Sequence, residues 1–155
     1  MRSSPRRVSN LARRRVPRVT VAIATPFTEQ GGVDEDGIAR TVVWLQAQGI
    51  ASIIPGGTTG EFAAMMASER LQVLEATRRA AGDNCFLFAN VSACAVGDAL
   101  TLARQATASL AKPDALLLLP PYYHQPFSAG TGAYGCKQFF RSVLQGLGAA
   151  AITTP

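Results

Sequence analysis

The chain alternates short apolar runs with longer stretches of helical periodicity, and this order constrains its fold more than any other feature. The apolar runs are predicted strands at residues 20–24, 51–55, 85–91 and 114–119, with the opening of a fifth at 149–153. The intervening stretches are predicted helices at residues 34–48, 68–81, 98–110 and 137–145. Continuous apolar strands that alternate with helices are typical of a parallel α/β sheet.

An open doubly wound sheet and part of a (β/α)8 barrel would both produce this pattern. A dinucleotide-binding sheet requires GxGxxG after the first strand, whereas the sequence ATPF stands there, at residues 24–27. The chain has 155 residues, which suits one domain, whereas a complete barrel typically needs about 250. Its 48% of hydrophobic residues allows a packed core, and no apolar run reaches the roughly 18 residues of a membrane span.

Positive charge is concentrated at the amino terminus. Seven of the 15 basic residues are arginines within the first 18 positions, and residues 19–155 carry eight basic and ten acidic side chains. We expect residues 1–18 to be a disordered, dispensable extension and residues 19–155 to be the folded domain, which is an incomplete barrel if the second of the two architectures above holds. The alternatives for the arginines are binding to nucleic acid or to an anionic surface, and a targeting role.

The three cysteines, Cys85, Cys94 and Cys136, are odd in number and match no CxxC spacing. They therefore predict neither a disulfide framework nor a zinc site, and we expect no cofactor. Small core residues in a reducing, cytoplasmic setting are the simplest interpretation.

The sequence GGTTGE at residues 56–61, the GGTTGE loop, directly follows the second predicted strand. Active sites of parallel α/β proteins lie at the carboxyl ends of strands. The hydroxyls of Thr58 and Thr59 and the amides around Gly57 and Gly60 could hold a carboxylate or an oxyanion there. The alternative is a turn in which the hydroxyls bond back to their own backbone.

A second candidate, Pro120-Pro121-Tyr122-Tyr123, follows the fourth predicted strand. A tyrosine hydroxyl there could relay a proton, or the ring could pack at a subunit interface. The single histidine, His124, follows the tyrosines, and we expect it to be a solvated loop residue. Only two lysines occur, Lys112 before the fourth strand and Lys137 on the following helix, and neither is placed to form a Schiff base in a pocket.

Several short motifs together resemble the dihydrodipicolinate synthase and N-acetylneuraminate lyase family, over about residues 20–155. They are ATPF (24–27), VD (33–34), WL (44–45), GI (49–50), GTTGE (57–61), ER (69–70) and PYY (121–123). The resemblance implies a (β/α)8 barrel, here its first four units and the start of strand five. It also implies an enzyme that acts on a 2-oxo acid such as pyruvate through a Schiff-base lysine.

The resemblance also implies roles for individual residues. Thr58 would join a proton relay, Thr59 would bind the substrate carboxylate, and Gly57 and Gly60 would shape the loop. Tyr123 resembles the tyrosine that family dimers insert into the neighbouring subunit's relay, which implies a homo-oligomer.

Departures from the family pattern are equally informative. Ile152 stands where the relay tyrosine is expected, and the strand-six lysine would lie beyond Pro155. Met66 replaces a helix-capping Ser or Thr, and Asn90 stands where many members have glycine. We therefore favour a truncated family member that is inactive alone. Two other hypotheses follow in order: a non-catalytic remnant that binds a 2-oxo acid or a partner, and a nucleic-acid binder led by the arginines.

Overall fold

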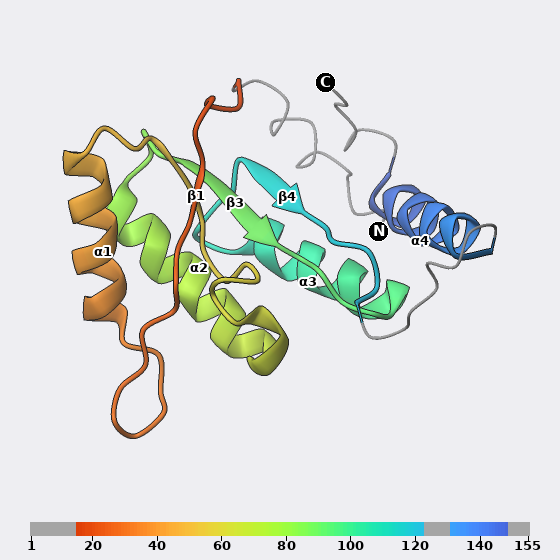
Figure 1. Ribbon diagram of the computed structural model, residues 1–155, viewed down its shortest axis with the longest axis horizontal. Coiled ribbons are helices and arrows are strands. Elements are labelled where there is room, and N and C mark those ends of the chain that lie inside the picture. The colour runs from red at the N-terminus through yellow and green to blue at the C-terminus, as the bar shows by residue number, and fades with distance from the viewer. Residues whose placement is uncertain (1–14, 123–130, 149–155) are drawn as a thin grey trace, which may run out of the picture.

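The computed structural model describes residues 15–122 and 131–148, and the predicted fifth strand and most of the arginine-rich segment lie outside them. Its elements run in the order β1 (Val21–Ala22), α1 (Glu35–Ala47), β2 (Ser52–Ile54), the 3-10 helix η2 (Phe62–Ala64), α2 (Ala67–Ala81), β3 (Phe86–Asn90), α3 (Val96–Ala108), β4 (Ala115–Leu117) and α4 (Thr131–Leu147) (Figure 1). Within these residues no helix is both long and apolar enough to cross a membrane.

The four strands form one sheet in the order β1-β2-β3-β4, and every pair is parallel. Val21 aligns with Ile53, Ile53 with Leu87, and Ala89 with Leu116. Each strand therefore pairs with the next one along the chain, as in a barrel wall. The prediction of a parallel α/β sheet is confirmed.

Helices cover one face of this sheet (Figure 1). Ile23 and Ile53 pack in one apolar cluster with Val42 of α1 and Val73 of α2. A second cluster joins strands β3 and β4 to α2 and α3; its members include Leu87, Ala89, Leu116, Leu74 and Ala103. Because successive strand residues point to opposite faces, the residues between these positions belong to the other face of the sheet.

The predicted boundaries need three corrections. All four strands are shorter than the predicted apolar runs, and β1 and β4 are shortened most. The one-turn helix η2 was not predicted. Helix α4 begins at Thr131, six positions before the predicted start, and its buried Phe139 and Val143 pack with Ala99 of α3.

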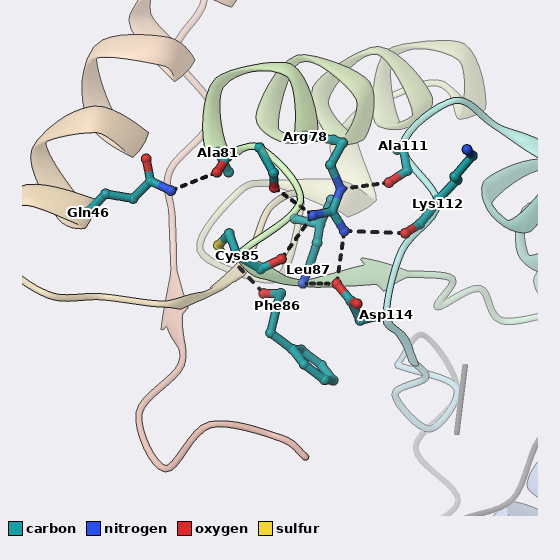
Figure 2. A network of polar contacts seen from close by, with 10 residues as sticks. Gln46, Arg78, Ala81, Cys85, Phe86, Leu87, Ala111, Lys112 and Asp114 are labelled. Carbon is teal, nitrogen blue, oxygen red and sulfur yellow. Dashed lines mark hydrogen bonds and ion pairs between the residues drawn. The ribbon is translucent and has the colours of Figure 1, made fainter. Parts of the chain in front are cut away.

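Arg78 closes the amino ends of the strands (Figure 2). Its guanidinium donates to the carbonyl oxygens of Ala111, Gly82, Cys85 and Lys112 and to Asp114 Oδ2, at 2.8 to 3.3 Å. Asp114 Oδ2 also accepts from Leu87 N at 2.8 Å. The side chains of Arg78 and Asp114 are only 9% and 11% exposed, so this buried pair holds α2, β3 and β4 together.

Candidate functional site

The GGTTGE loop leaves β2 at the carboxyl end of the sheet and is rigidly shaped. Gly56 and Glu61 both have positive φ angles, 54° and 62°. A Cβ added to Gly60 would lie 2.8 Å from Gly56 N and 3.0 Å from Ile23 O, so no larger residue fits there. Thr25 Oγ1 donates to Gly60 O at 2.7 Å from a buried position. The loop is thus held against the end of β1.

Asn90 ties the same loop to the ends of β3 and β4. Its Nδ2 donates to Gly56 O at 2.7 Å, and its Oδ1 accepts from the N and Oγ atoms of Ser92 at 3.0 and 2.5 Å. Ser92 Oγ in turn accepts from Leu119 N at 2.8 Å. The carboxyl ends of β2, β3 and β4 are therefore joined through the side-chain amide of Asn90 and the hydroxyl of Ser92. The sequence marked Asn90 only as a departure and did not predict this role.

The four loop residues predicted to form the site divide into two groups. Gly57 and Gly60 are buried, whereas Thr58 and Thr59 are exposed. The backbone carbonyls of Thr58 and Gly57 accept from Glu61 N and Phe62 N at 3.1 and 3.3 Å. Within the described residues neither threonine hydroxyl has a hydrogen-bond partner, so both can meet a ligand from solvent.

Behind the loop, Arg70 of α2 contacts the carboxyl end of β3. Its Nη1 and Nη2 donate to the backbone oxygens of Ser92 and Asn90 at 3.1 and 2.8 Å, and its guanidinium carbon lies 5.2 Å from the Phe62 ring centre, a cation–π contact. Burial lowers the pKa of Arg70 from its ordinary value, but arginine stays protonated at neutral pH. Nothing in the sequence pattern predicted these partners.

A cavity of about 20 Å³ lies between α2, α3 and β3, with Gly56, Arg70, Asn90 and Gln105 among its lining residues. The Nε atom of Arg70 is buried and has no partner among the described residues. A volume of this size accommodates about one water molecule. It is therefore too small to be a substrate pocket, and the solvent-facing side of the GGTTGE loop is the better candidate.

Tyr122 marks the carboxyl end of β4 beside this cluster. Its ring packs edge-on against Phe62, with the ring centres 5.2 Å apart, and the residue is 50% exposed. Desolvation of the inner part of the side chain raises the pKa of Tyr122, the neighbouring Cys94 adds to this, and the positive charge of Arg70 opposes it. Tyr122 therefore stays a neutral phenol through the physiological pH range.

Neither of the two lysines shares this end of the sheet. Lys112 is exposed at the amino end of β4, near Arg78, and Lys137 is exposed on α4. Tyr123, His124 and Ile152 lie outside the described residues. Among His, Cys, Asp and Glu side chains of the described part of the chain, no group of three could hold a metal ion.

Comparisons with known proteins agree with this geometry. The sequence model of the Dihydrodipicolinate synthetase family matches residues 15–152. The 4-hydroxy-tetrahydrodipicolinate synthase of Parasynechococcus marenigrum is 35% identical over 128 residues, which are 83% of this chain and 40% of the relative. That of Methanothrix thermoacetophila is 37% identical over 109 residues, 70% of this chain and 36% of the relative.

The solved dihydrodipicolinate synthase of Acinetobacter baumannii, a chloride-inhibited form complexed with pyruvate, is similar in structure. It has a TM-score of 0.72 and 32% identity, and the match covers 88% of this chain and 43% of that one. The chain thus spans about 40% of the length of the relatives it matches, which agrees with the predicted partial barrel. On the residues matched and the fold they form, the chain belongs to the dihydrodipicolinate synthetase family.

Proposed function

We propose that the GGTTGE loop binds the carboxylate of a small 2-oxo acid such as pyruvate. The observation that carries this proposal is the pair of exposed hydroxyls of Thr58 and Thr59, which have no partner among the described residues. They stand on a loop held by Thr25 and Asn90. A rigid loop presents its donors without an ordering cost at the moment of binding. The structural relative complexed with pyruvate supports the choice of ligand.

The loop residues have separate parts in this proposal. Thr59 donates its hydroxyl to the carboxylate. Thr58 and Tyr123 hold positions of a proton relay that this chain alone does not complete. Gly57 and Gly60 shape the loop, because a Cβ on Gly60 would collide with the backbone of Gly56 and Ile23. If Tyr123 acts on the neighbouring subunit's site, a homo-oligomer is the form that binds.

We further propose that this chain alone binds the acid without turning it over. A Schiff base requires a desolvated lysine at the binding site, and both lysines of the chain are exposed away from the GGTTGE loop. Ile152, at the expected relay position, has no proton to transfer. A cytoplasmic location fits the three cysteines, none of which forms a disulfide within the described residues.

Calorimetric titration with pyruvate tests the binding site. Thr59→Ala removes a hydroxyl donor worth ~1 kcal/mol, so we expect the dissociation constant to rise about fivefold. Thr101→Ala is the matched control, because Thr101 is an exposed threonine of α3 whose hydroxyl donates to Gly97 O. Equal affinities of the wild type and Thr59→Ala would remove Thr59 from the site.

A further inference from the structure

Arg70 lies one turn into α2, shortly after the GGTTGE loop and η2. Its neighbour Glu69 accepts from Met66 N at 2.7 Å and so supports the start of the helix. The side chain of Arg70 is half-buried, and its two Nη atoms donate to the backbone oxygens of Asn90 and Ser92 at 2.8 and 3.1 Å. The guanidinium therefore fixes the first turn of α2 to the carboxyl end of β3.

The same guanidinium also fixes the residue that follows the GGTTGE loop. The Arg70 guanidinium carbon lies 5.2 Å from the centre of the Phe62 ring, within the range of a cation–π contact. Phe62 is only 5% exposed, and its N donates to Gly57 O at 3.3 Å. Its ring also packs edge-on against Tyr122. Because Phe62 is held from two sides, the end of the loop is held with it.

Both ends of the GGTTGE loop converge on Asn90. The side-chain amide of Asn90 donates to the oxygen of Gly56, the first residue of the loop, at 2.7 Å. The backbone oxygen of Asn90 accepts from Arg70, which in turn contacts Phe62 just beyond the last residue of the loop. The two exposed threonines therefore stand between two anchors that meet at the end of β3.

We propose that Arg70 is a positioning residue for the carboxylate-binding site, which holds the GGTTGE loop so that the Thr59 hydroxyl faces the ligand. This inference rests on the proposed function and adds a residue that acts through the loop. A planar guanidinium can donate to two carbonyl oxygens while it stacks on an aromatic ring, whereas an ammonium group is a single point charge. The site therefore requires an arginine at this position, and a positive charge alone does not suffice.

Hydrogen exchange of the loop amides in Arg70→Lys tests the positioning without any ligand. The amides of Glu61 and Phe62 donate to the backbone oxygens of Thr58 and Gly57, so they report on the fold of the loop. We expect both to exchange at least about fivefold faster in Arg70→Lys. The matched control is Arg40→Lys, because Arg40 is an exposed arginine of α1 that pairs with Asp34. It should leave both rates unchanged.

Calorimetric titration with pyruvate then tests whether the positioning acts through Thr59. Arg70→Lys should raise the dissociation constant by up to about fivefold, the full contribution expected of the Thr59 hydroxyl. In a Thr59→Ala background the same change at Arg70 should cause no further loss, because residues that act through one another are not additive. A merely structural role of Arg70 would give the same fold-change in both backgrounds.

A second variant protects the test against a failure of Arg70→Lys to fold. Phe62→Leu removes the ring but leaves an apolar side chain, and it should accelerate exchange at Glu61 in the same way. Unchanged exchange in the folded variants, or equal losses of affinity in the two backgrounds, would overturn the positioning role. A wild-type chain that does not bind pyruvate would instead refute the proposed function, and the exchange rates would still decide whether Arg70 holds the loop.

Discussion

The two ends of the sheet differ in how their polar groups are used. At the amino end, Arg78 is buried and donates five hydrogen bonds to described partners. At the carboxyl end, Thr58 and Thr59 present hydroxyls to solvent that no described residue satisfies. In barrel enzymes the amino end contributes stability and the carboxyl end contributes chemistry. The proposed binding site of this chain, which spans about 40% of a relative such as the Parasynechococcus marenigrum synthase, follows the same division.

Helix α2 connects the two ends and shows the difference within one element. Its last turn carries Arg78, and Gly82 N donates to Arg78 O at 2.9 Å. Its first turn follows Met66, whose side chain makes no capping hydrogen bond. Glu69 Oε2 accepts from Met66 N at 2.7 Å, which is half of a capping box. The terminal backbone groups of α2 are therefore better supplied with hydrogen bonds at the end that carries Arg78 than at the end that follows the GGTTGE loop.

The largest expected effect comes from Arg78→Ala. The substitution removes a buried positive charge beside Asp114 and the donors to four backbone carbonyl oxygens, so the free energy of unfolding should fall by ~3–5 kcal/mol. Arg79→Ala is the matched control, because Arg79 pairs with Glu35 at the surface, where their side chains are 58% and 41% exposed. It should cost ~1 kcal/mol or less. Urea denaturation measures both, and similar losses for the two variants would contradict the assigned role of the amino end.

A smaller effect is expected from Asn90→Asp at the other end. The carboxylate keeps the acceptor for Ser92 but loses the donor to Gly56 O, so the unfolding free energy should fall by ~1–3 kcal/mol. Because the GGTTGE loop loses one of its ties, pyruvate affinity should fall as well. Denaturation and calorimetry on the same variant measure the two effects. A loss of stability with unchanged affinity would show that Asn90 supports the fold alone.

The smallest effect is expected from Met66→Ser, which supplies the missing cap of α2. A serine at this position can accept from the backbone N–H groups of the first turn, and the gain in unfolding free energy should be ~0.5–1 kcal/mol. Ala67→Ser, one position inside the helix, is the control and should give no gain. If Met66→Ser does not increase stability in thermal unfolding, the N–H groups in the first turn of α2 already have adequate hydrogen-bond partners.

Much of the fold was predictable because it depends on local pattern. The apolar runs and helical spacing predicted all four described strands, the four α-helices and the parallel sheet. The place of the GGTTGE loop at the carboxyl end of β2 followed from its position after an apolar run. Short-range signals of this kind act within a few residues, so a single sequence contains them.

The supporting contacts were not predictable in the same way. Asn90 bonds to Gly56 O across 34 positions, and Arg78 bonds to Asp114 across 36. Such partners are chosen by the three-dimensional arrangement of the strand ends, and residue type alone does not identify them. Helix α4 was predicted too short because the glycines in its first turns, Gly132 and Gly135, are typical of a loop.

The central claim is that the carboxyl end binds a 2-oxo acid while the chain alone lacks the amine for Schiff-base chemistry. The most direct test is to incubate the purified chain with pyruvate and borohydride and to weigh it by mass spectrometry, with a full-length relative treated in parallel as the positive control. We predict no stoichiometric adduct on Lys112 or Lys137. A stoichiometric adduct on one of them, abolished when that lysine is changed to alanine, would contradict the claim.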